Sequence, residues 1–94
     1  EASFGRYGRL RLKYLKEHWK VLYINLSTSG ELTRHLNEID RQAREMLKLL
    51  VKQMAQAQGI TEQLKAEDQM AWVGAMNNIR SAAEEAVIHS LLLQ

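Results

Sequence analysis

Residues 31–58 read ELTRHLNEIDRQAREMLKLLVKQMAQAQ and lie between Gly30 and Gly59. Apolar residues recur in this stretch at intervals of three and four, the spacing that places them on one face of a helix. A single amphipathic helix cannot hide such a face from water, so the flanking segments must cover it. The apolar positions are Leu32, Leu36, Ile39, Ala43, Met46, Leu50, Met54 and Ala57.

The flanking segments are also predicted to be helical. Apolar residues at helical spacing run through residues 9–27 and again through residues 61–93, and the chain contains no proline to interrupt them. Gly30 and Gly59 are expected to end helices, and Thr61 to cap the start of the next one. We therefore predict an all-α fold, a single domain over residues 1–94. It is an antiparallel three-helix bundle of long amphipathic helices over residues 9–27, 31–58 and 61–93.

The third predicted helix carries two apolar faces. One face has large side chains, and the other is made of small ones, which allow a close approach by a neighbour. Two faces suggest two neighbours, so we expect self-association through this helix, with a dimer as one outcome. The tail Leu91-Leu92-Leu93 would also be poor solvent surface on a monomer. The small-residue face comprises Leu64, Ala71, Gly74, Ala75, Ala82 and Ala86.

Composition limits the class of protein. The chain has 94 residues, of which 46% are hydrophobic and 26% charged, values typical of a globular domain. No apolar run approaches the roughly 18 residues of a membrane span, so no membrane partner is expected. Cysteine is absent, which excludes disulfides and thiol chemistry and is compatible with a cytoplasmic location. The chain starts at Glu1 rather than Met, so we expect it to be a trimmed piece of a longer one.

Charge is distributed unevenly along the chain. Residues 1–30 carry six Lys and Arg against two Glu, whereas residues 61–94 carry two basic against five acidic residues. At about 100° per residue, five cations gather on one side of the first helix, where phosphates are their natural ligands. A solvated face, or a face directed at the acidic third helix, would explain the same pattern. The candidate DNA-binding residues are Arg6, Arg9, Lys13, Lys16 and Lys20.

Other residues are assigned to packing rather than to chemistry. Trp19, Leu32 and Ile39 fall on apolar stripes and are expected in the core. Asp40 and Arg44 lie beside the seam of the central helix and are interpreted as part of an inter-helix ion pair. Catalytic residues, metal ligands and cofactors are not expected, because the sequence offers no nucleophile–base pair, no metal-ligand spacing and no phosphate-binding loop. The chain is accordingly not expected to be an enzyme.

Several segments together resemble the TnpV family of transposon-encoded proteins. They cover nearly the whole chain in order, although family members usually begin with a further acidic stretch containing Leu and Pro. The resemblance implies a gene carried by bacterial mobile elements, without an activity or a catalytic motif to transfer. The segments are FGRYGRL at 4–10, YLKEH at 14–18, VLYINL at 21–26, TSG at 28–30, EIDRQA at 38–43, QGITE at 58–62, WVG at 72–74 and MNNIR at 76–80.

Three functions remain open from the sequence, of which the third is a self-associating structural bundle. The first is a small accessory protein of the mobile element, contacting DNA or a protein–DNA assembly through the basic helix. The second is a protein-interaction module, an adaptor or inhibitor of a recombinase or a host defence protein. The expected location of the gene on a mobile element favours the accessory protein, but this argument is associational and not physical.

Overall fold

The computed structural model describes residues 4–94, and it is helical over nearly all of that range. The elements are α1 (Arg6–His18), α2 (Lys20–Thr28), α3 (Leu32–Ala57), α4 (Glu62–Glu67), α5 (Gln69–Val87) and a π-helical turn, η1 (Ile88–Leu92). The molecule is elongated, with extents of 55 × 23 × 17 Å. Within the described residues, no helix is both long and apolar enough to cross a membrane.

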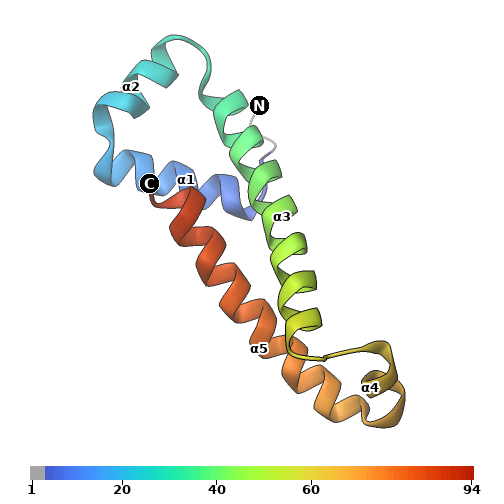
Figure 1. The fold of residues 1–94 in the computed structure, drawn as a ribbon. Helices are drawn as coiled ribbons and strands as arrows, with labels where there is room; N and C mark the ends of the chain where they lie inside the picture. The colour runs from blue at the N-terminus through green and yellow to red at the C-terminus, as the bar shows by residue number, and fades with distance from the viewer. Residues whose placement is uncertain (1–3) are drawn as a thin grey trace.

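The long helix α3 organises the fold, as its sequence pattern predicts. Figure 1 shows α3 and α5 as antiparallel neighbours, with α1 lying across them near the C-terminal end of α5. Leu36 and Ala43 on α3 and Leu15 on α1 are fully buried in this arrangement. The Leu91–Leu93 tail packs here too, with Leu92 fully buried, so it is not the exposed surface that the sequence suggested. The core therefore sits where α1 crosses the helical pair.

Two glycines end helices in the predicted way. Gly30 has φ of +77° and Gly59 has φ of +70°, the left-handed conformation that glycine adopts without strain. At each of them, backbone N–H groups donate to the last carbonyls of the preceding helix, as in Glu31 N to Leu26 O at 2.9 Å. Thr61 then caps α4, because its hydroxyl accepts from Leu64 N at 3.2 Å.

The prediction of three uninterrupted helices is wrong in two places. The helix expected over residues 9–27 breaks at Trp19, which has φ of −134° and ψ of 56°. The helix expected over residues 61–93 breaks at Asp68, whose side chain caps α5 by accepting from Ala71 N. At Trp19 the chain changes direction, so that α2 leads back toward the start of α3 (Figure 1). A straight continuation of α1 would lead away from α3. Residues 4–94 consequently form five α-helices of unequal length rather than three long ones.

Trp19 is also the clearest error in the predicted core. Its side chain is 47% exposed, because it stands at the break between α1 and α2 and not on a continuous apolar stripe. Leu32 and Ile39 are half-buried on α3, consistent with packing roles.

Candidate functional site

The N-terminus of α1 is held by a carboxylate from another helix. Gly5 occupies the N-cap position of α1 and has no side chain to accept hydrogen bonds from the first turn. Asp40 on α3 does so instead: its Oδ1 accepts from Tyr7 N at 3.1 Å and from Gly8 N at 3.0 Å. Asp40 is only 4% exposed, so these two bonds are shielded from water. The negative charge also lies at the positive end of the helix dipole.

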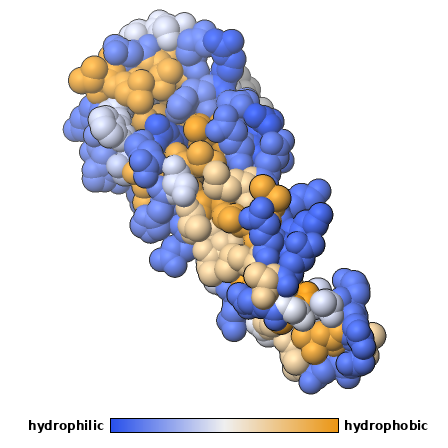
Figure 2. Space-filling view, viewed as in Figure 1, coloured by the Kyte–Doolittle hydropathy of each residue, from blue (hydrophilic) through white to orange (hydrophobic). Residues whose placement is uncertain are grey.

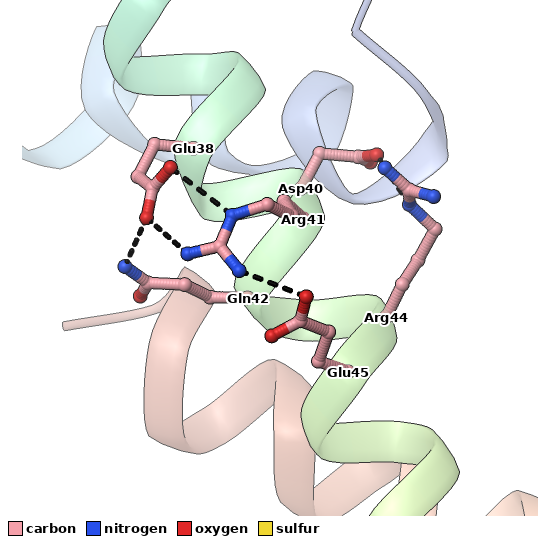
Figure 3. A network of polar contacts seen from close by, with 6 residues as sticks. All are labelled: Glu38, Asp40, Arg41, Gln42, Arg44 and Glu45. Carbon is pink, nitrogen blue, oxygen red and sulfur yellow. Dashed lines mark hydrogen bonds and ion pairs between the residues drawn. The ribbon is translucent and has the colours of Figure 1, made fainter.

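Asp40 has a further partner on its own helix. Arg44 Nε donates to Asp40 Oδ2 at 2.9 Å, as Figure 3 shows. The Asp40–Arg44 pair therefore lies within α3, and the interpretation of an inter-helix ion pair is wrong, although Asp40 does join two helices. Burial acts to raise the pKa of Asp40, but the N–H of Gly8, the Arg44 guanidinium and the N–H of Tyr7 outweigh it, and the pKa lies below its ordinary value.

A second acid, Glu84 on α5, binds the same end of α1. Arg6 forms a hydrogen-bonded ion pair with Glu84, and Tyr7 Oη donates to Glu84 Oε2 at 2.8 Å. The hydrogen bonds from Arg6 and then Tyr7 lower the pKa of Glu84, while burial and the bond to Glu84 raise the pKa of Tyr7. The segment Gly5-Arg6-Tyr7-Gly8 thus ties α1 to both α3 and α5.

Arg11 completes this attachment farther along α1. It is 7% exposed, and its Nη1 donates to the carbonyls of Gln94 at 2.6 Å and Leu92 at 3.3 Å. Its Nε lies 3.4 Å from His35 Nε2. Burial lowers the pKa of Arg11, and burial together with the Arg11 charge lowers the pKa of His35. Arg11 therefore caps the carbonyl end of η1 and is not available to a ligand.

The five predicted DNA-binding residues do not form one continuous surface. Arg6 is committed to Glu84, and Lys20 lies beyond the break at Trp19, so neither belongs to a continuous stripe. Arg9, Lys13 and Lys16 remain exposed on α1, within about 60° of one another around the helix. Among residues 4–94, none of these three forms an ion pair. Arg9 Nη1 donates to Phe4 O at 3.5 Å, and Lys16 Nζ lies 5.6 Å from the centre of the Tyr23 ring.

A second basic surface was not singled out from the sequence. A groove of about 460 Å³ runs between α3 and α5, with Leu47 and Val51 among its lining. The cations Arg44, Lys48 and Arg80 and the acid Glu84 also line it. The sequence shows that Arg44 and Lys48 are four residues apart, on one side of a helix. That spacing is common on solvated helix faces and does not by itself indicate a binding site. Only the position of α5 brings Arg80 beside them.

Other charged groups on α3 pair locally. Arg41 contacts Glu38 and Glu45, and Gln42 donates to Glu38 at 2.9 Å (Figure 3). These bonds, led by that from Arg41, lower the pKa of Glu38 to about 2. The pairs are solvent-exposed, so water screens them and they contribute little to stability. In the part of the chain that is described, no group of three or more His, Asp and Glu side chains could hold a metal ion.

Stability should fall in acid because of Asp40 and Glu84. Both carboxyls have pKa values below those of the unfolded chain, which are about 3.9 and 4.3, so their contribution is present above those values. It is lost as the pH falls through their folded-state values. We expect the free energy of unfolding from urea titration to decline below about pH 4. The decline should be shallower in Asp40→Asn; an identical pH profile in that variant would contradict this assignment.

Comparison with known proteins gives one family. The family model described as transposon-encoded protein TnpV matches residues 1–92. No curated protein and no solved structure matches the chain. The matched range includes α1 and the Asp40 and Glu84 side chains that hold its N-terminus.

Proposed function

We propose that this chain, which belongs to the TnpV family of transposon-encoded proteins, is a non-enzymatic accessory protein of a bacterial mobile element that contacts DNA through α1. The residues assigned to this contact are Arg9, Lys13 and Lys16. Lys20 on α2 is a peripheral contact, and Arg6 is left out because its guanidinium is paired with Glu84, although its side chain remains exposed.

The main support for DNA binding is that the basic residues of α1 fall into two groups, one that attaches the helix to the rest of the protein and one that is exposed. Arg6 and Arg11 are used to attach α1 to the rest of the protein, whereas Arg9, Lys13 and Lys16 are exposed and closely spaced. Side chains of like charge on one helix face repel one another unless water or an external anion intervenes. A row of phosphates supplies such anions without requiring a base sequence.

The proposal assigns no catalysis to the chain. Its sequence offers neither a nucleophile with an adjacent base nor a phosphate-binding loop, so the role is one of binding. The affinity should consequently depend on salt more than on DNA sequence.

Fluorescence anisotropy with a labelled generic duplex tests the DNA contact. Three phosphate contacts predict a slope of about −3 in a plot of log K against log salt, since each contributes about −0.9. The triple variant Arg9→Gln, Lys13→Gln and Lys16→Gln should lose most of that slope and of the affinity at low salt. A matched triple variant elsewhere, Lys48→Gln, Lys52→Gln and Arg80→Gln, should retain both. Equal losses in the two triple variants would contradict a specific role of α1.

A second candidate function is favoured by α2. None of its residues is buried, although it is rich in apolar side chains. Such a surface suits a protein-interaction module, for example an adaptor or inhibitor of a recombinase or a host defence protein. In that case Val21→Ser with Ile24→Ser would abolish binding of a purified recombinase from the same element and leave DNA binding unchanged.

A further inference from the structure

Within residues 4–94, one face of α2 is left exposed, while Tyr23 and Leu26 on its other side are half-buried. Trp19 at its N-cap is 47% exposed, Val21 is 74% exposed and Ile24 is 54% exposed. Figure 2 shows an orange patch at the end of the molecule where α2 lies. A nine-residue helix gains little stability from its own hydrogen bonds. The apolar surface of α2 is thus suited to pack against another surface.

The opposite end of the molecule has apolar surface with the opposite charge. Met70 is 81% exposed at the start of α5, and Val73 is also exposed. Glu62, Glu67 and Asp68 surround this region, against a single cation, Lys65. The α1–α2 end carries exposed Lys16 and Lys20 beside Glu17. Glu31 and Glu38 also lie near α2, but each is paired with an arginine of α3. The two ends are complementary in both charge and hydrophobicity.

Small residues on α5 connect the two ends. Several lie exposed along the helix, and a Cβ added at Gly74 would meet no atom within 4 Å. In Figure 2 a pale orange band runs along the middle of the face between the α2 patch and the α4 end. Such a surface lets the backbone of a neighbouring helix approach closely. The exposed small residues of α5 are Ala71, Gly74, Ala82 and Ala86.

We propose that a second copy of this chain covers these surfaces in an antiparallel, two-fold symmetric dimer. In this dimer α2 of each protomer packs on α4 and the start of α5 of its partner, with the small-residue face of α5 between them. Two-fold symmetry forms each complementary contact twice. A parallel arrangement would instead place basic end on basic end, with repulsion between like charges.

The size of the molecule permits such an interface. Its broad side measures 55 × 23 Å, more than the roughly 800 Å² that each partner contributes to a standard stable interface. The dimer shares Lys16 and Lys20 with the proposed DNA contact, but it also uses the acidic end and the apolar residues of α2, which the DNA contact does not require. Glu62→Lys with Glu67→Lys therefore tests the dimer without changing any proposed DNA-binding residue.

Sedimentation velocity without DNA tests the dimer. At about 0.1 M salt, the double variants Lys16→Glu with Lys20→Glu, and Glu62→Lys with Glu67→Lys, should each weaken dimerisation about tenfold or more. Combining all four changes should restore it. Val21→Ser with Ile24→Ser should give a monomer, whereas Leu49→Ser, at a position 55% exposed on α3 outside the named surfaces, should not. A wild-type chain that stays monomeric at high concentration, or a dimer that survives Val21→Ser with Ile24→Ser, would overturn the proposal.

Cross-linking tests the antiparallel arrangement separately. The chain has no cysteine, so single cysteines report unambiguously on proximity. Mixed under oxidising conditions, V21C and M70C variants should form the heterodimeric disulfide in preference to either homodimeric one. Preferential V21C–V21C linkage would show a parallel contact and overturn the arrangement, even if the dimer itself were confirmed.

Discussion

Replacement of Asp40 by alanine is expected to lower the free energy of unfolding by about 3 kcal/mol. The change leaves the N–H groups of Tyr7 and Gly8 buried without an acceptor, and each such loss costs roughly 1–3 kcal/mol. It also removes the charge that faces the helix dipole of α1. Because total stability of a small domain is about 5–15 kcal/mol, the variant should unfold at a clearly lower urea concentration.

Asp68 supplies a matched control for this experiment. It too caps a helix, accepting from Ala71 N at 3.1 Å, but it is exposed and its contact is local. Asp68→Ala should therefore cost about 1 kcal/mol, the ordinary value for an N-cap. Asp40→Asn should fall between the two alanine variants, since the amide retains an acceptor oxygen. If Asp40→Ala costs no more than Asp68→Ala, Asp40 does not attach α1 to α3 in the way described.

Alanine at Gly8 should be the other destabilising change, by up to about 2 kcal/mol. A Cβ at Gly8 would stand 2.7 Å from Phe4 Cβ and 2.9 Å from Phe4 Cδ2, so the Phe4 segment must shift. Overpacking of this kind costs roughly 1–3 kcal/mol, which exceeds the gain of about 1 kcal/mol from replacing glycine in a helix. Chemical denaturation of the purified variant measures the net effect.

Replacing Gly74 by alanine should instead raise the free energy of unfolding. No atom lies within 4 Å of a Cβ added there, so only the helix-propensity gain of about 1 kcal/mol remains. Both variants should be compared at protein concentrations low enough to keep the chain monomeric, because association would add to apparent stability. Equal effects at the two glycines would show that Phe4 does not pack closely against α1.

The sequence was informative wherever local rules determine structure. The predicted central helix, residues 31–58, agrees with α3 to within one residue at each end, since an apolar stripe and two terminating glycines define it. Trp19 was misplaced because periodicity assumes an uninterrupted helix. The pattern holds on both sides of the residue, and only the attachment of α1 across α3 and η1 requires the chain to turn there.

The candidate site was predictable only in part, for a related reason. Counting charges found the basic residues of α1, and Arg9, Lys13 and Lys16 are indeed exposed. Counting charges along the sequence could not show that Arg6 pairs with Glu84, which is 78 residues away. Nor could it show that Asp40 caps a helix other than its own, because that contact exists only after α1 has packed on α3.

Light scattering coupled to size-exclusion chromatography, with and without a generic DNA duplex, tests most directly whether the basic surface of α1 binds DNA. We expect a protein–DNA complex at about 50 mM salt that dissociates at about 500 mM, because Arg9, Lys13 and Lys16 displace counterions from phosphates. A protein whose mass at the lower salt is the same with and without the duplex would contradict it.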